Sequence, residues 1–306
     1  MKVTPLPGRV TAIEVLSPSL RRFTLAPEAG LFPPAAAGAH VMVTLRGEQR
    51  VWRNAYSLAS RPGARAAWEI IVRLVSPSRG GSAFLHERVA VDDPILIDPP
   101  VNLFPVAKLA RKHLLIAGGI GATPFLSYLP ALTAPFELHQ FCRPDDEPAF
   151  RHLLPGAHIH TTRERIDLPA LFASQPLGTH LYTCGPPAFM DLVTSIARAS
   201  GYPPGKIHLE RFGGATGGAA FRVVLQNSGR RIDVGSDQTL LDALEEAGID
   251  APCLCRGGAC GQCRVGVLAG IPEHRDHVLT DAEHATNDAI MTCVSRARSP
   301  ELVLDL

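Results

Sequence analysis

The sequence predicts a multi-domain fold with three parts in order: an antiparallel β-barrel, an α/β domain with a parallel sheet, and a small α+β domain. Three observations predict it. Roughly the first third of the 306 residues consists of short β-rich runs separated by turns. The middle third alternates buried strands with helices and contains a glycine-rich turn after its first strand. The last part carries a cysteine-rich loop at residues 251–265. The chain is long enough for each part to have its own core.

The composition narrows the class of protein. Hydrophobic residues make up 46% and charged residues 19%, which is ordinary for a globular protein, and the formal net charge is +1. A balanced charge argues against nucleic acid or an acidic membrane surface as a partner. The uncharged run at 114–136 is long enough to span a bilayer, but three glycines and three prolines interrupt it, so we expect no membrane span. The sequence opens on no signal peptide, which predicts a cytoplasmic protein with reduced thiols.

The barrel is predicted from six short runs that alternate or are β-branched and are divided by turn residues. They are residues 9–16, 20–25, 40–45, 52–57, 67–75 and 94–97. Regularly spaced short strands are typical of a closed barrel or a sandwich.

Two stretches of this barrel have side chains suited to ligand binding. In Arg53-Asn54-Ala55-Tyr56-Ser57-Leu58, a strand end presents a forked cation, an aromatic face with a hydroxyl and a small donor. In Arg79-Gly80-Gly81-Ser82-Ala83-Phe84, a glycine turn leads into a short helix over 82–88, whose N-terminus suits a phosphate. A tyrosine packed under an arginine and a simple capped helix would explain the same residues without a ligand.

The middle domain is predicted from strands at 113–117, 136–141, 159–162 and 180–184, with helical segments between them, including 188–199. The first strand runs into Gly118-Gly119-Ile120-Gly121-Ala122-Thr123, and the fourth ends in Cys184-Gly185-Pro186. Because the carboxyl ends of parallel strands share one sheet edge, we expect these loops to face each other across a crevice that suits a pyrophosphate. A tightly packed turn without a ligand would look similar. Arg143, Asp145 and Asp146 follow the second strand and leave the charge preference at an adenine ribose open.

The cysteine loop has the most specific spacing in the chain. Cys255, Cys260 and Cys263 form C-x4-C-x2-C, and Cys293 follows after 29 intervening residues. This spacing matches the ligation pattern of a plant-type [2Fe–2S] cluster. Glycines 257, 258 and 261 allow the backbone to approach the inorganic sulfides.

Other interpretations of these residues are less well supported. A structural zinc site normally takes its cysteines from paired knuckles, and a disulfide framework needs an oxidising compartment. Cys253 is predicted to be a packed small residue. The stretch His274-Arg275-Asp276-His277 has no close cysteine pair, so it is predicted to be a polar turn and not a Rieske site.

Taken together, these motifs resemble the phthalate dioxygenase reductase family, which includes the reductase of vanillate demethylase. The resemblance implies an FMN-binding, ferredoxin-reductase-like barrel at 1–106, an NAD-binding domain at 107–212, a linker at 213–219 and a β-grasp ferredoxin domain with a plant-type [2Fe–2S] cluster at 220–306. The Arg-Gly-Gly-Ser turn is the form that the family uses with FMN, so FMN is expected in preference to FAD. Family habit also favours NADH.

The same resemblance implies roles for individual residues. The flavin would be held by Arg53, Tyr56 and Ser57, flanked by Val72 and Arg73, and bound at its phosphate by Arg79, Gly80, Gly81 and Ser82. The nucleotide would lie against Gly118, Gly119, Gly121, Gly185 and Pro186, with Thr123 near the flavin. Tyr56, Ser57, Cys184 and Phe212 would act at the reacting rings, Cys184 near the nicotinamide. The family's Pro-Arg-Asn is here Pro100-Val101-Asn102, so any contact made by that arginine is missing.

The implied activity is an electron relay. Reduced nicotinamide gives up two electrons at once, a [2Fe–2S] cluster accepts one at a time, and a flavin can do both. The expected acceptor is a Rieske-type oxygenase component, whose organic substrate this chain would not contact. Two alternatives remain: a stand-alone flavin reductase or diaphorase, and a non-enzymatic iron–sulfur carrier.

Overall fold

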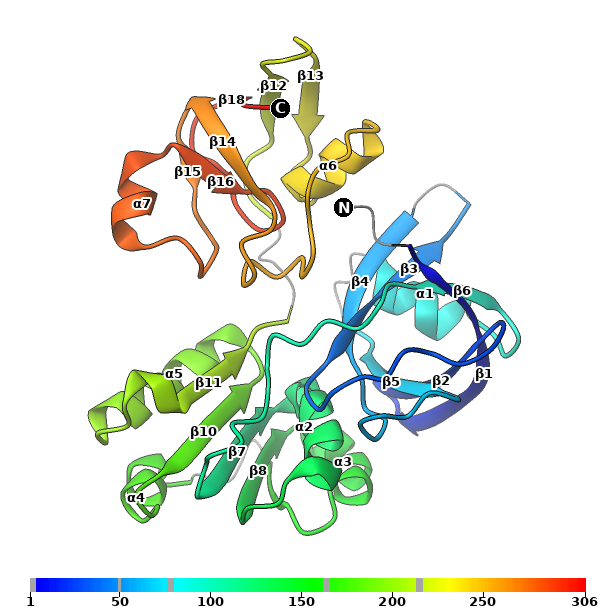
Figure 1. The fold of residues 1–306 in the computed structure, drawn as a ribbon, viewed down its shortest axis with the longest axis vertical. Helices are drawn as coiled ribbons and strands as arrows, with labels where there is room; N and C mark the ends of the chain where they lie inside the picture. Colours follow the sequence, from blue (N-terminus) through cyan, green and yellow to red (C-terminus); the bar gives the residue numbers. More distant parts are fainter. Residues whose placement is uncertain (1–3, 49–50, 76–79, 162–165, 213–216) are drawn as a thin grey trace. The chain divides into compact units, whose positions relative to one another are not determined.

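The computed structural model describes residues 4–48, 51–75, 80–161, 166–212 and 217–306. It divides into two compact units, Met1–Phe212 and Gly213–Leu306. The first holds a barrel and a parallel sheet, and the second holds a mixed sheet with helices (Figure 1). The predicted fold class is therefore confirmed. Arg79 and linker positions 213–216 lie outside the described residues.

The barrel consists of six antiparallel strands in the order β4-β3-β6-β1-β2-β5. They are β1 Leu6–Ser17, β2 Leu20–Pro27, β3 His40–Arg46, β4 Val51–Ser57, β5 Trp68–Arg73 and β6 Pro94–Ile97. A bridge between Leu58 and Ile70 joins the two edges of the sheet and closes it. Helix α1, Gly81–Glu87, follows the glycine turn. The alternating side chains that predicted the strands fill the core, where Phe32 stacks on Trp68 at 4.0 Å between ring centroids.

The α/β part contains five parallel strands in the order β11-β10-β7-β8-β9. They are β7 Lys112–Gly118, β8 Phe136–Cys142, β9 His158–Thr161, β10 Thr179–Cys184 and β11 Ile207–Glu210. The connections contain α2 Thr123–Tyr128, α3 Glu147–Leu153, α4 Leu168–Ala173, α5 Pro187–Ala199 and the 3-10 turns η1 Gly119–Ala122, η2 Leu129–Ala131, η3 Pro144–Asp146 and η4 Pro204–Lys206.

Alternation along β7 distributes the helices over two faces. Leu115 and Ala117 pack with α2 and α3, whereas Leu114 and Ile116 pack with α4 and α5 (Figure 1). The uncharged run at 114–136 thus folds as most of β7, three short helical turns and the start of β8. In the part of the chain that the structure describes, no helix is long and apolar enough to cross a membrane.

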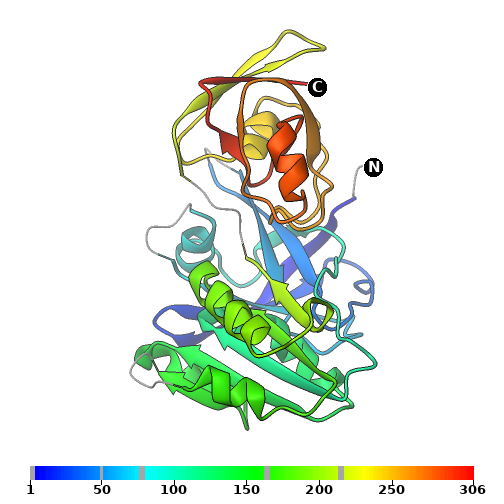
Figure 2. The same cartoon turned by 90° about the vertical axis from the view of Figure 1, so that its left-hand side faces the viewer.

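The second unit has a five-stranded mixed sheet in the order β13-β12-β18-β14-β16. Its strands are β12 Phe221–Leu225, β13 Arg231–Val234, β14 Arg264–Ala269, β16 Ala289–Met291 and β18 Glu301–Leu304, and β15 Pro272–Glu273 pairs separately with β17 Arg296–Ala297. Helix α6, Leu240–Glu246, is capped by Thr239 and buries Leu240, Leu241 and Leu244 in the core of this unit. Figure 2 shows the unit from the side, with α6 in yellow. Helix α7, Asp281–Thr286, begins with a capping box from Thr280 and Glu283.

Candidate functional site

The sheet of the second unit brings the distant cysteine to the cysteine loop. Cys263 immediately precedes β14 and Cys293 follows β16, and these two strands pair with Arg264 opposite Met291. As a result the Sγ atoms of Cys263 and Cys293 lie 3.2 Å apart. Cys255, Cys260, Cys263 and Cys293 form no disulfide, and the backbone N–H of Gly257 donates to the Cys255 Sγ at 3.4 Å. The structure therefore places the four predicted ligands as free thiols on one loop and one adjoining turn.

In each of two cysteine pairs, the environment favours the thiolate form of one thiol and raises the pKa of the other. The pKa of Cys255 is lowered to about 5, first by a hydrogen bond from Cys260 and then by backbone N–H groups, against the effect of burial. Cys293 similarly lowers the pKa of Cys263 to about 7. Thiolates surrounded by inward backbone N–H groups are what an iron–sulfur cluster requires, so the donor set fits a [2Fe–2S] group.

The loop is fastened to α6 by a residue that the sequence did not single out. Arg256 has a left-handed backbone, with φ of 51°, and its guanidinium contacts Asp242 at 2.9 Å and also Glu245. Gly258 and Gly261 have φ of 69° and 75°. A Cβ on Gly258 would lie 2.7 Å from a methyl of Val294, so the loop needs glycine there both for its conformation and for space.

In the first unit, the two predicted loops at the sheet edge are in direct contact. A Cβ placed on Gly121 would lie 2.2 Å from the carbonyl oxygen of Cys184, and one on Gly185 would lie 3.0 Å from the Cα of Gly118. Pro186 packs over the same point, since a Cβ on Gly118 would lie 2.9 Å from its Cδ. The structure therefore brings these two loops together, as expected. At these glycines the loops are in backbone contact, whereas the sequence predicted a crevice between them.

Behind these loops lies a group of buried polar side chains. Ser57 ends β4 opposite His40 on β3, and Glu210 lies opposite Cys184 in the parallel pairing of β10 and β11. His40 Nδ1 lies 3.7 Å from Glu210 Oε1. Cys184 is fully buried, and burial together with the Glu210 charge raises the pKa of its thiol well above the usual value. Cys184 is therefore a neutral thiol at neutral pH, not a reactive thiolate.

Two polar atoms in this part of the first unit indicate a ligand-binding site. Ser57 Oγ and Glu210 Oε2 are buried and have no hydrogen-bond partner among the described residues. An unpaired buried polar atom costs about 1–3 kcal/mol, so such atoms are usually satisfied by something bound. This fits a polar cofactor at the end of β4. Glu210 and His40 could not be identified from the sequence, because they come together only where the barrel packs on the α/β part.

The other predicted flavin residues lie on β4, β5 and the glycine turn. Tyr56 OH accepts from Asn54 Nδ2 at 3.1 Å, and Arg53 lies 3.5 Å from Asp98. Gly80 and Gly81 approach β4 so closely that added Cβ atoms would strike Trp52 and Asn54. Ser82 lies in the first turn of α1. Val72 is buried in the barrel core and its carbonyl contacts His86 Nε2 at 3.0 Å.

Three further positions considered in the sequence lie elsewhere in the first unit. Thr123 is buried and its hydroxyl donates to the Ile120 carbonyl at 3.0 Å, so it holds the glycine turn itself. Phe212, at the end of the first unit, has 40% of its surface exposed. Val101, which stands in place of the family's arginine, forms a backbone bridge with His40.

Asp146 connects the barrel to the α/β part and is not available to a ribose. This buried carboxylate accepts from Ser17 Oγ at 2.6 Å and Ser19 Oγ at 2.8 Å, and it pairs with Arg73 at 3.3 Å. Arg73 in turn lies against Gly119, because a Cβ built on Gly119 would be 2.9 Å from the Nη1 atom of Arg73. Of the three charges left open after β8, only Arg143 and Asp145 are exposed.

Replacing Asp146 with asparagine is expected to lower the free energy of unfolding of the first unit by about 1–3 kcal/mol, because the half-buried Arg73 loses its counter-charge. Circular dichroism during urea unfolding measures the change. The control is Asp145→Asn at the exposed neighbour, where little change is expected. Equal losses in both variants would contradict the structural role of Asp146.

The chain combines an antiparallel barrel, a parallel sheet with helices on both faces, and a β-grasp unit with four thiols. This combination defines the class of ferredoxin-reductase-like proteins that carry a ferredoxin domain of their own. Comparisons with known proteins agree. Residues 223–298 match the family model of the 2Fe-2S iron-sulfur cluster binding domain. The chain is 41% identical to the heme-dependent oxidative N-demethylase beta subunit of Ectopseudomonas mendocina strain ymp, covering 99% of both. It is 40% identical to the vanillate O-demethylase oxidoreductase of Pseudomonas sp. strain HR199, covering 91% of this chain and 92% of that one.

Among solved structures, phthalate dioxygenase reductase is similar over 99% of this chain and 98% of its own, with a TM-score of 0.85 and 32% identity. That protein is described as a modular structure for electron transfer from pyridine nucleotides to [2Fe–2S]. The chain belongs to the phthalate dioxygenase reductase family, as the motifs predicted.

Proposed function

We propose that this protein is the NADH-dependent reductase component of a two-component, Rieske-type oxygenase or demethylase system, working in the cytoplasm, where thiols stay reduced. The observation that carries the proposal is the set of four free cysteines in a β-grasp unit, on a chain that matches reductases over nearly their full length. A chain with an iron–sulfur cluster and no second cofactor would be only an electron carrier. The orphaned polar atoms beside the interlocked glycine loops support a cofactor site in the first unit as well.

The proposed cofactors are FMN and a [2Fe–2S] cluster. A flavin, when bound, exchanges electron pairs with nicotinamide and single electrons with an iron–sulfur centre. The proposed flavin ligands are the side chains of Arg53, Tyr56, Ser57 and Arg79 and the backbone at Val72, Gly80, Gly81 and Ser82, with the cluster held by Cys255, Cys260, Cys263 and Cys293. The proposed domain limits are 1–106, 107–212 and 220–306, with a linker at 213–219.

The chain's own residues would position the reacting groups. We infer that the backbone at Gly118, Gly119, Gly121, Gly185 and Pro186 receives the nucleotide, with Thr123 supporting that turn. Ser57 Oγ is free to donate a hydrogen bond, and the neutral thiol of Cys184 offers a small apolar contact that excludes water. The exposed ring of Phe212 would cover the reacting face until the nicotinamide arrives. Asp145 favours NADH, because an exposed carboxylate would repel a 2′-phosphate.

Cofactor analysis of the purified protein, followed by assays with both nucleotides, tests this function. We expect FMN, with about two iron and two sulfide per chain, since that is the composition of a plant-type cluster. NADH should reduce cytochrome c through the protein faster than NADPH does. Zinc in place of iron, or a flavin that neither nucleotide bleaches, would overturn the proposal.

A further inference from the structure

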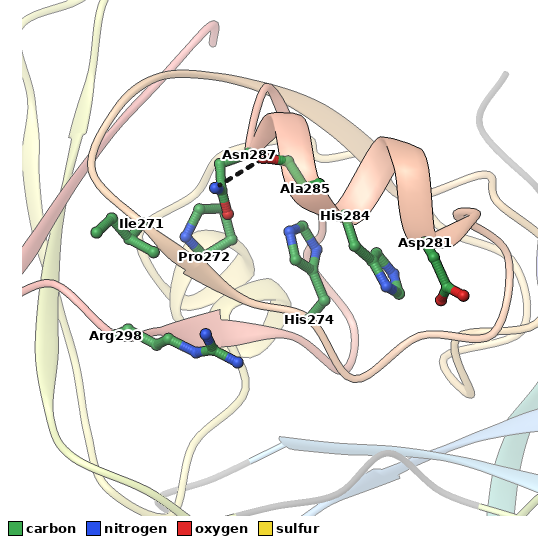
Figure 3. Close-up of a pocket in the computed structure, with 8 residues that line it drawn as sticks. All are labelled: Ile271, Pro272, His274, Asp281, His284, Ala285, Asn287 and Arg298. Carbon is green, nitrogen blue, oxygen red and sulfur yellow. Dashed lines mark hydrogen bonds between the residues drawn. The ribbon is translucent and has the colours of Figure 1, made fainter.

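The second unit contains a cluster of metal-binding side chains apart from the cysteines. One ligand atom each of His274, Asp276 and His284 lies within 4.8 Å of the other two. His274 and Asp276 belong to the segment after β15, and His284 comes from α7. Figure 3 shows the two imidazoles in the pocket between that segment and the helix. Two parts of the chain thus deliver three donors to one place.

The arrangement is fixed around the carboxylate. Asp276 is fully buried, and its Oδ2 accepts the backbone N–H groups of Val278 at 3.1 Å and Leu279 at 2.9 Å. Its Oδ1 lies 3.4 Å from His284 Nε2 and 4.0 Å from His274 Nδ1. The two imidazole rings stack at 4.4 Å between centroids with 17° between their planes. The Oδ1 atom therefore faces a nitrogen of each ring.

The imidazole nitrogens are not satisfied by the protein. Both ring nitrogens of His274 and the Nε2 of His284 are buried without a hydrogen-bond partner among the described residues. The Asn287 side chain and the His284 backbone approach the His274 ring, but neither makes a hydrogen bond of good geometry. Three such atoms in one place destabilise the fold unless something binds them.

We propose that His274, Asp276 and His284 bind one divalent transition-metal cation, Zn²⁺ in the first instance, in addition to the iron–sulfur cluster. Two imidazoles and one carboxylate are a common donor set for zinc, with a further position left for water or another carboxylate. Beside them is a cavity of about 360 Å³ with room for that ligand. Asp281 lines it, three residues before His284 on α7, and Figure 3 shows its carboxylate next to the His284 ring.

Such a site would brace the segment that lies against the cysteine loop. The backbone N–H of His277 donates to the Gly258 carbonyl at 3.0 Å, and a Cβ on Gly258 would lie 3.3 Å from the Asp276 Cα. A metal ion joining this segment to α7 would therefore hold the support of the loop in place. Small side-chain shifts suffice for binding, because donors around tetrahedral zinc are roughly 3.3 Å apart at bond lengths of about 2.0 Å.

Zinc titration of the full-length holoprotein tests the site. After equilibrium dialysis against ZnCl₂, we expect one zinc per chain in addition to the cluster iron, with the visible spectrum unchanged. His274→Gln and His284→Gln should each weaken zinc binding at least about 10-fold, since each removes a ligand. Zinc K-edge X-ray absorption should show only nitrogen and oxygen neighbours, at about 2.0–2.1 Å.

The matched control is His158→Gln. His158 belongs to the other His-carboxylate group, Glu137, His139 and His158 in the first unit, and its loss should leave zinc binding unchanged. If His158→Gln loses zinc while His274→Gln and His284→Gln keep it, the proposal is overturned. So would a sulfur shell at about 2.3 Å with release of iron, which would place the zinc on cysteines. Absence of bound zinc in the wild-type protein would overturn it as well. Circular dichroism would establish that His284→Gln, on a short surface helix, is folded.

Discussion

Replacing Cys260 with serine is expected to reduce NADH-driven reduction of cytochrome c by at least about 100-fold, because single electrons then have no iron–sulfur exit. Reduction of the flavin itself by NADH should be unaffected, since the cysteine loop belongs to the second unit and the proposed flavin residues to the first. The measurement pairs stopped-flow bleaching of the flavin with steady-state cytochrome c reduction. The two rates should separate in the variant and remain coupled in the wild type.

The matched control is Cys253→Ser, two residues before the first proposed ligand. Cys253 is partly buried and packs against the core of the second unit, and its Sγ lies 3.9 Å from Glu245 Oε1. It lies outside the C-x4-C-x2-C spacing, so this variant should keep its iron and its cytochrome c activity. If one-electron output survives in Cys260→Ser, the cluster is not the exit, and a stand-alone flavin reductase becomes the better description.

The sequence predicted the elements that depend on local pattern or on fixed chemistry. The strand expected at 94–97 is β6 at those residues, and the helix expected at 188–199 is α5, which begins one residue earlier. Alternation and glycine turns determine such elements within a few residues. Metal ligation is equally constrained, because a cluster of fixed size needs thiols at fixed spacing. Hence the four cysteines could be proposed as the ligands without any knowledge of the sheet that brings Cys293 to the loop.

Contacts between side chains that are far apart in the sequence could not be predicted. Asp146 looked like a candidate for the ribose because it follows β8, yet the fold buries it under Ser17, Ser19 and Arg73. Only the packing of barrel against sheet decides this. The stretch His274 to His277 gives a second example: His277 is nearest to Asp276 in sequence, whereas the ring beside its carboxylate is that of His284, from α7. A charged side chain's neighbours in three dimensions are not encoded in its neighbours along the chain.

Replacing Gly121 with alanine is expected to destabilise the first unit by about 3 kcal/mol and to weaken NADH binding, because the two glycine loops can no longer interlock. The added methyl group would lie 2.2 Å from the carbonyl oxygen and 2.4 Å from the carbonyl carbon of Cys184. Both are backbone atoms, fixed by the parallel pairing of β10 with β7, so no side-chain rotation relieves the clash. Thermal unfolding followed by circular dichroism, and the KM for NADH, measure the two effects.

Gly205→Ala is the matched control in the same α/β part. No heavy atom lies within 4 Å of a Cβ built on Gly205, and its backbone is outside the left-handed region, so the added methyl is accommodated. This comparison separates the clash at Gly121 from any general cost of losing glycine. If the two variants are equally stable, the loops must be able to move apart. If the KM for NADH rises only in Gly121→Ala, at a temperature where both variants are folded, the contact between the two loops supports nucleotide binding as well as stability.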